Sequence, residues 1–151
     1  MSTDLEQTDH RKLAVELFNH VWTLIEQENR GPREVDEMIH AAHASRYHWG
    51  IAGTLLQCAR GEWQISRVYA VLGRGEPAAW HASRYMEYCE SNECPAFDKA
   101  FAHESMARAA AYSGNAERCA EHIGKARLIS NEIQDEEDRA YLLSELATIS
   151  G

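Results

Sequence analysis

The sequence of 151 residues predicts an all-α protein built as a stack of antiparallel helix pairs. Apolar residues recur at helical spacing along the chain, and no window alternates apolar and polar residues long enough to indicate a strand. Turns marked by Gly31, Gly75 and Gly114 are 44 and 39 residues apart, a spacing of stacked helix pairs. We therefore expect one α-helical repeat domain over residues 1–151, with about seven helices, the last of which caps the stack.

The segment from Thr3 to about Glu28 predicts the first helix. Thr3 and Glu6 have the spacing of a capping box, in which two side chains bond to each other's backbone N–H groups. Apolar residues then follow at helical intervals, at Leu13, Leu17, Val21, Leu24 and Ile25. This helix should bury one side and expose the other.

The second helix is expected from Pro32 to about Arg46. Gly31 is expected to stop the first helix in a left-handed conformation, and proline presets the first turn of the next helix. The apolar pattern breaks after Arg46, where two glycines bracket an isoleucine, so residues 47–53 are expected to form a loop.

Thr54 and Gln57 form a second potential capping box and open the third helix, which should continue to Leu72. Gly61 lies inside this helix, where glycine costs about 1 kcal/mol relative to alanine. It therefore either permits a close approach of a neighbouring helix or divides the element. Gly75 and the residues that follow it should turn the chain.

Four further helices complete the predicted stack. Apolar and small residues at helical spacing indicate helices within residues 78–89, 97–112 and 116–126. Asp135 can cap a final helix whose first turn holds the acidic residues 136–138, the charge that a helix amino terminus favours.

Composition excludes several classes of partner. The formal net charge of −9 argues against DNA and RNA, because binding to phosphate backbones depends on clustered Lys and Arg. No apolar run approaches the ~20 residues that span a bilayer, so we expect no membrane association and a cytoplasmic location. The four cysteines lack CxxC spacing and predict reduced, mostly buried thiols.

One face of the third helix carries the candidate binding residues. Four side chains fall within about 60° of one another on a helical projection, namely Arg60, Trp63, Arg67 and Arg74. An indole one turn from a guanidinium allows cation–π stacking, and forked guanidinium groups suit a carboxylate. This stripe predicts a groove for a protein or an acidic peptide, with His81 and His103 nearby. The alternative is that the arginines pair with acids of this chain, Glu62 or residues 136–138, while the indole packs between helices.

A second set of candidates lies on the second helix. Asp36, His40, His43 and Tyr47 line one stripe at spacings of four, three and four. Two histidines one turn apart can share a Zn²⁺ ion, with His48 or a residue of another helix completing the site. This pattern predicts an alternative function, a small metal-dependent or ligand-binding enzyme. The other interpretation is a polar flank beside the apolar stripe.

Two segments resemble the tetratricopeptide repeat. The second-helix half of that pattern is matched loosely by Gly114, Cys119, Ile123 and Ala126, and the first half by Trp63, Tyr69, Leu72 and Gly75. The turn spacing departs from the family's period of about 34 residues. The chain also resembles a group of short bacterial proteins without an assigned activity, over the phrases YHWGIAG, ARGEWQISRVYAVLGRGEPAAWHA, FDKAFAHESMARA and DEEDRAYLL.

The resemblance implies a tetratricopeptide-like module for protein–protein interaction or self-association. Stacks of three helix pairs are short, and an exposed end favours a homodimer. The apolar side of the last helix, with Leu143, Leu146 and Ile149, or the first helix could supply the contact.

Overall fold

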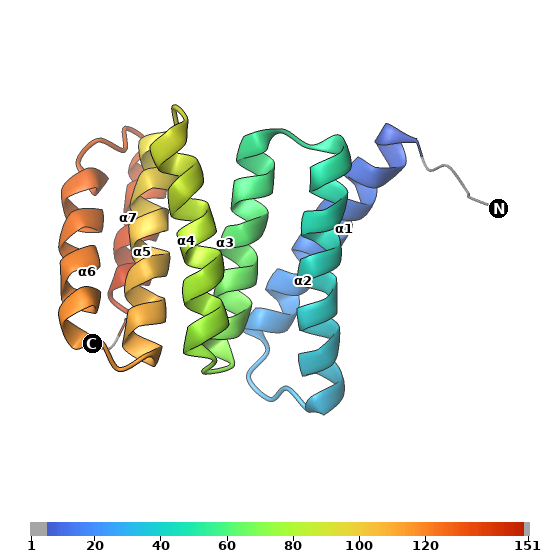
Figure 1. Ribbon diagram of the computed structural model, residues 1–151, viewed down its shortest axis with the longest axis horizontal. Coiled ribbons are helices and arrows are strands. Elements are labelled where there is room, and N and C mark those ends of the chain that lie inside the picture. Colours follow the sequence, from blue (N-terminus) through green and yellow to red (C-terminus); the bar gives the residue numbers. More distant parts are fainter. Residues whose placement is uncertain (1–5, 150–151) are drawn as a thin grey trace.

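A computed structural model describes residues 6–149, which form seven α-helices and no strand (Figure 1). The helices are α1 (Gln7–Glu26), α2 (Pro32–Ala52), α3 (Leu55–Val71), α4 (Gly75–Ser91), α5 (Ala96–Tyr112), α6 (Ala116–Ser130) and α7 (Glu136–Leu146). The predicted all-α stack of helix pairs with a carboxyl-terminal helix is confirmed. None of the helices within the described range is long and apolar enough to cross a membrane.

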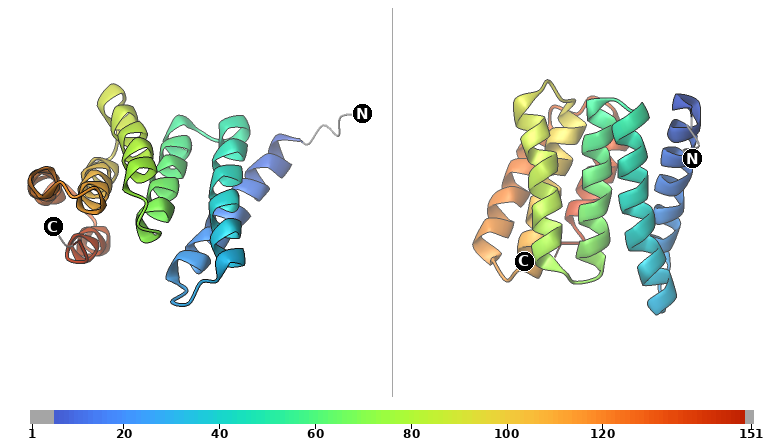
Figure 2. Two further views of the ribbon diagram at one scale, coloured as in Figure 1. Left: turned by 60° about the horizontal axis from the view of Figure 1, so that its bottom comes forward. Right: turned by 45° about the vertical axis from the view of Figure 1, so that its right-hand side comes forward.

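The helices pack in three successive pairs, α1 with α2, α3 with α4, and α5 with α6. Helix α7 packs on α5 and α6 and lies behind them in Figure 1; Figure 2 shows the stack from two further sides. Helices α1, α3, α5 and α7 pack against one another in sequence, whereas the backbones of α2, α4 and α6 do not approach one another closely within the described residues. The odd-numbered helices therefore form one continuous surface, here called the odd-helix face.

Two large buried clusters hold the stack together. One joins α1, α2 and α3 around Val21, Met38 and Ile65, and the other joins α3 to α7 around Tyr85 and Phe101. These side chains are almost fully buried, and burial of an apolar side chain of this size is worth roughly 1.5–3 kcal/mol. Small residues fill the remaining contacts and let the helices approach closely, as at Ala70, Ala78 and Ala109.

Two of the predicted helix caps are confirmed. Thr54 Oγ1 accepts a hydrogen bond from Gln57 N at 3.1 Å, and Gln57 Oε1 accepts one from Thr54 N at 2.9 Å. Asp135 Oδ1 accepts from Asp138 N at 2.9 Å and so caps α7. Helix α1 begins after Glu6, whose N–H donates to a carboxylate oxygen of Asp9 at 3.3 Å; the Thr3 half of the predicted capping box lies outside the described residues.

The predicted loop at residues 47–53 is wrong, because α2 continues unbroken to Ala52. Trp49 is buried in this last part of the helix, and the Arg11 guanidinium lies 5.9 Å from its ring centroid. This packing against α1 offsets the low helix propensity of the neighbouring glycine. Gly31 also differs from expectation: it is the N-cap of α2 with a φ of −83°, so it does not adopt a left-handed conformation.

The left-handed turns lie at Gly73 and Gly114, each with a φ of +73°. The second turn therefore uses Gly73, two residues before the predicted position. Within α3, Gly61 permits a close helix approach and does not divide the helix. A Cβ atom there would lie 2.9 Å from Arg46 Cδ and 3.5 Å from Arg46 Cα on α2.

Candidate functional site on the odd-helix face

Trp63 lies at the centre of the odd-helix face, where its side chain is only 6% exposed. Its ring centroid is 5.7 Å from that of Trp22, 4.9 Å from Phe101 and 6.3 Å from Phe97. The Trp63 indole therefore packs between helices, as the alternative interpretation of the stripe predicted. The indole Nε1–H nevertheless finds no hydrogen-bond partner among the described residues. A buried donor without a partner costs ~1–3 kcal/mol, which makes this atom a candidate for contact with a ligand.

Arg60 pairs with a buried acid of this chain. Its Nε and Nη2 atoms donate to the two carboxylate oxygens of Asp98 at 2.9 and 2.8 Å, and the Tyr85 hydroxyl donates to the same carboxylate at 2.7 Å. The hydrogen bonds that Arg60 donates to Asp98 raise the pKa of Arg60 above its ordinary value. Because Asp98 is fully buried, this forked pair fixes α3 against α5, while the outer part of the guanidinium stays accessible.

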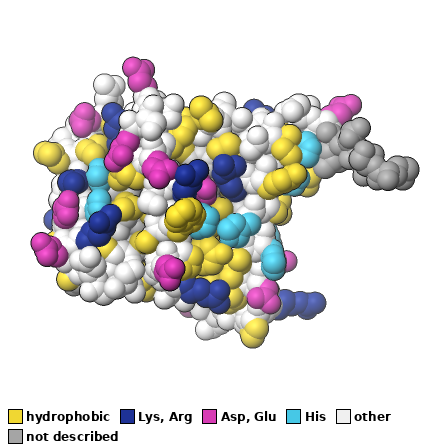
Figure 3. All heavy atoms as spheres, in the orientation of Figure 1, with side chains coloured by type: hydrophobic (Ala, Val, Ile, Leu, Met, Phe, Trp, Pro, Cys, Tyr) yellow, Lys and Arg dark blue, Asp and Glu magenta, His cyan; other side chains and the backbone are white. Residues whose placement is uncertain are grey.

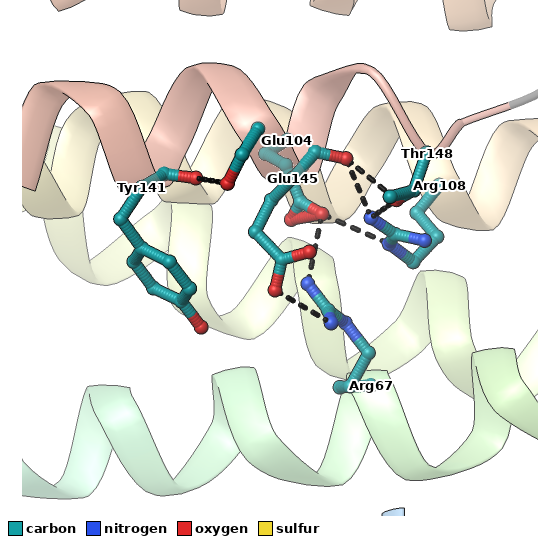
Figure 4. Close-up of polar contacts among 7 residues, drawn as sticks. Arg67, Glu104, Arg108, Tyr141, Glu145 and Thr148 are labelled. Atoms are coloured by element: carbon teal, nitrogen blue, oxygen red, sulfur yellow. Dashed lines mark hydrogen bonds and ion pairs between the residues drawn. The ribbon is translucent and has the colours of Figure 1, made fainter. Parts of the chain in front are cut away.

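Arg67 belongs to a network of two arginines and two glutamates (Figure 4). Its Nη2 donates to Glu104 Oε1 at 3.0 Å and its Nη1 to Glu145 Oε1 at 3.2 Å. Arg108 Nε donates to the same Glu104 oxygen at 2.9 Å, and its Nη2 donates to the Glu145 backbone carbonyl at 3.0 Å and to Thr148 Oγ1 at 2.8 Å. The network joins α3 and α5 to α7 and its carboxyl end.

Burial alone would lower the pKa of Arg67, but the charges of Glu104 and Glu145 outweigh it and raise that pKa above its ordinary value. The Arg67 side chain is 8% exposed and Glu104 is fully buried. Arg67 therefore cannot present its charge to a partner, and the prediction that it lines an open groove is wrong. The structure pairs it with acids, as the alternative held, although not with those at 62 or 136–138.

Helix α7 covers this end of the odd-helix face. Leu142 and Leu146 are buried in the larger core cluster, and the Tyr141 ring lies 5.4 Å from that of Phe101. Tyr141 and Glu145 lie one turn apart on α7. The Tyr141 ring contacts the Phe101 ring, and the Glu145 carboxylate contacts the Arg67 guanidinium. An acidic, aromatic helix of the chain itself occupies the place predicted for a partner.

The rest of the odd-helix face is open. A cavity of about 460 Å³ lies beside α7, and each odd-numbered helix contributes to its wall. It is lined by Phe18, Arg60, Trp63, Pro95, Phe97 and Asp138. A smaller hollow of about 180 Å³ shares Phe18 and Arg60 and extends the cavity towards Trp49 and Gln57. Two aromatic walls, a guanidinium and the ring of Trp63, whose indole N–H lies buried and without a partner, therefore meet at one cavity.

A larger cavity of about 640 Å³ lies between α4, α5 and α6. It is mostly apolar and includes the exposed side chain of Trp80 together with Met106 and Arg118. None of the buried polar atoms that lack a partner within the described residues belongs to its lining. It therefore offers area without the convergent polar groups that define a specific site.

Three of the predicted groove residues lie elsewhere. Arg74 follows the turn at Gly73, because α3 ends at Val71; it is exposed at the start of α4 and leaves the stripe. His81 contacts Glu62, which lies about 100° around α3 from Trp63 and so faces away from the groove.

His103 pairs with His122 between α5 and α6, with their Nδ1 atoms 2.9 Å apart. Partial burial and the charge of His122 lower the pKa of His103 to about 4. The prediction that this histidine lies beside the groove is therefore wrong, because its ring faces the outer helix of its pair.

The predicted metal set of His40, His43 and His48 does not converge. His48 Nδ1 lies 2.8 Å from His10 Nδ1 and so faces α1, whereas His43 Nε2 lies 2.9 Å from Tyr69 Oη on α3. Five residues on a straight helix turn a side chain by about 140°, and α2 is straight through this segment because the predicted loop is absent. Within residues 6–149, no group of three or more His, Cys, Asp or Glu is arranged to hold a metal ion.

Sequence reasoning missed the acids that satisfy the arginines. Asp98 and Glu104 occupy the buried side of α5, and Glu145 lies in α7. One signal was available, since Glu104 and Arg108 have the i,i+4 spacing of a helical ion pair. Phe18 and Phe97, which line the open cavity, gave no separate signal because aromatic residues at helical spacing are typical of any core.

Comparison of the chain with protein families, with curated proteins and with solved structures gave no match. Its function is therefore inferred from the geometry of the odd-helix face.

Proposed function

We propose that the protein is a tetratricopeptide-like interaction module that binds a segment of a partner protein in the open cavity of the odd-helix face. The observation that carries the proposal is that Trp63, a residue of the cavity lining, has a buried indole N–H without a hydrogen-bond partner. A bound acceptor would remove its desolvation penalty. The cavity volume of about 460 Å³ lies within the range of ~300–1,000 Å³ typical of ligand sites.

The chain's own α7 suggests what the partner segment presents. Tyr141 and Glu145 contact Phe101 and Arg67, and the neighbouring part of the face offers Phe97 and Arg60 in the same combination. We therefore propose an acidic peptide, helical when bound, with an aromatic side chain and a carboxylate four residues apart. The aromatic side chain would pack between Phe18 and Phe97, since aromatic pairs add ~0.5–1.5 kcal/mol beyond their burial.

A labelled peptide with the sequence of residues 135–149 is a suitable probe, because it carries this pair of side chains. We expect the full chain to bind it, as measured by fluorescence anisotropy, and Phe18→Ala to weaken binding at least tenfold. Val15→Ala is the matched control, because Val15 is a partly exposed apolar residue of α1 that does not line the cavity. A control peptide in which alanine replaces both Tyr141 and Glu145 should not bind.

Trp63→Phe tests the role of the unpartnered indole N–H directly, because the change removes this donor and keeps an aromatic ring in the core. Weaker peptide binding by this variant, with an unchanged helical circular-dichroism signal, supports the proposal. Equal binding by the wild-type chain, Phe18→Ala and Trp63→Phe would contradict it.

The cytoplasmic location and the homodimer belong to the same proposal. Leu146, one of the residues suggested for self-association, is buried in the core and cannot contact a second copy. Leu143 is 40% exposed, on another side of α7. Light scattering after size exclusion measures the oligomeric state. A strict monomer at high concentration would remove the dimer.

A further inference from the structure

Three helices bring two histidines together on another side of α3, away from the cavity of the odd-helix face. His43 of α2 and His81 of α4 have ring centroids 5.5 Å apart, with an angle of 71° between the ring planes. Tyr69 of α3 lies beside both: its ring is stacked on His81 at 5.9 Å, and its hydroxyl is 2.9 Å from His43 Nε2. Figure 3 shows histidine side chains close together in the middle of this face of the molecule. The two imidazoles come from helices whose backbones do not pack against each other.

A carboxylate fixes the orientation of one of these imidazoles. Glu62 Oε2 lies 3.0 Å from His81 Nδ1 and accepts a hydrogen bond from it, which leaves the Nε2 lone pair of His81 available. His81 and Glu62 are 16% and 15% exposed, so their packing holds this pair in place. A carboxylate behind a histidine is the arrangement that supports metal-ligating imidazoles, because it sets the tautomer and raises the basicity of the free nitrogen.

The spacing of the rings suits one shared ion. With metal–nitrogen distances of about 2.0–2.1 Å, each ring centroid lies about 3.2 Å from the metal, and two centroids at a tetrahedral angle are about 5.2 Å apart. The observed 5.5 Å is close to this value. His43 would exchange its contact with the Tyr69 hydroxyl for the ion, which leaves that hydroxyl beside the metal.

The surroundings of His43 favour its neutral form, which is the form of an imidazole that binds a metal ion. Partial burial, followed by the neighbouring His81, lowers the pKa of His43 below its ordinary value. The groups that face it are His40 on its own helix, Tyr69 and Glu62 from α3, and His81 from α4. Glu62 is the carboxylate among them, and Arg46 lies 3.9 Å from its other oxygen.

We propose that His43 and His81 bind one divalent transition-metal ion of the class that favours imidazole, such as Zn²⁺ or Ni²⁺, with Glu62 orienting His81. The site differs from the predicted one, in which His40 and His43 of α2 share the ion, because its second imidazole comes from α4. The chain supplies two imidazoles, and water or the Tyr69 hydroxyl completes the coordination. Because the ion would join α2 to α4 only in the folded chain, its binding stabilises the fold.

The test is isothermal titration of the full chain with ZnCl₂ and, separately, NiCl₂, together with thermal unfolding followed by circular dichroism. We expect one ion per chain and a rise in Tm with metal concentration. His43→Ala and His81→Ala should each weaken binding at least 100-fold. Glu62→Gln should weaken it 10- to 100-fold while both ligands remain, which distinguishes an orienting carboxylate from a bystander.

Matched controls remove one histidine from each of the other close pairs. His10→Ala and His103→Ala should leave the affinity and the Tm rise unchanged. Metal-free thermal unfolding of every variant shows whether the fold is intact. The proposal is overturned if the wild-type chain binds no metal, if His43→Ala and His81→Ala bind as tightly as the wild type, or if a control variant loses the ion instead.

Discussion

Replacement of Arg67 by methionine should show that the guanidinium stripe of α3 holds the fold together. The change keeps most of the buried side-chain volume and removes the charge that Glu104 and Glu145 share. Removal of one partner of a buried ion pair typically costs 3–5 kcal/mol, because a charge is left without compensation. Arg108 Nε still donates to Glu104 Oε1 at 2.9 Å. We therefore expect a loss near the lower limit, about 3 kcal/mol in the free energy of unfolding.

A double-mutant cycle separates this interaction from loss of packing. Glu104→Gln alone should cost about 2 kcal/mol, since it leaves both arginines with one carboxylate fewer. Arg67→Met combined with Glu104→Gln should cost 1–2 kcal/mol less than the sum of the single changes, because the second change removes the unpaired charge that the first creates. Urea unfolding at pH 7 followed by far-ultraviolet circular dichroism supplies the three free energies.

Two results would refute this reasoning. One is a loss below about 1 kcal/mol for Arg67→Met, which would place the guanidinium in water. The other is strict additivity in the cycle, which would mean that Arg67 and Glu104 do not interact in solution.

Three further predictions concern single features of the fold. His103 has a pKa of about 4 in the folded chain and about 6.5 when unfolded, so the unfolded state binds an extra proton as the pH falls below 6.5. The stability that comes from keeping His103 neutral is therefore complete above pH 6.5 and is lost as the pH falls towards 4. After allowance for solvent screening, we expect the free energy of unfolding to fall by ~1–2 kcal/mol between pH 7 and 4.5, as measured by urea titration. The variant His103→Gln should not show this decrease. Gly114→Ala places a side chain at a φ of +73° and should cost ~1 kcal/mol of unfolding free energy, measured by urea denaturation, although no neighbouring atom lies within 4 Å of the new methyl group. Thr54→Ala removes the acceptor for Gln57 N and should lower the unfolding free energy by ~1 kcal/mol in the same assay, with Thr23→Ala as a control within α1.

Features that depend on neighbouring residues could be predicted from the sequence. The Thr54 and Asp135 caps act within one turn, and the period of apolar residues specifies each helix without reference to the rest of the chain. The end of α2 could not be predicted in this way. Its last turns are helical because Trp49 packs against α1, and that contact overrides the two glycines that indicated a loop.

The candidate site could be predicted only in part for the same reason. The stripe of Arg60, Trp63 and Arg67 does lie on one face of α3, as the helical projection indicates. Its exposure depends on where Glu104 and Glu145 lie, and these residues are 37 and 78 positions from Arg67 in the chain. No local pattern specifies which helix covers which face.

The separation of 78 residues between Arg67 and Glu145 also orders events during synthesis on the ribosome. The cluster around Met38 and Ile65 needs only the first three helices, so it can assemble while the chain is still being made. The Arg67 guanidinium pairs with Glu104 of α5, which it shares with Arg108, and it gains its second carboxylate only when α7 has been made. A nascent chain that stops before Glu145 therefore has two guanidinium groups at one buried carboxylate, and one positive charge of this network is left uncompensated.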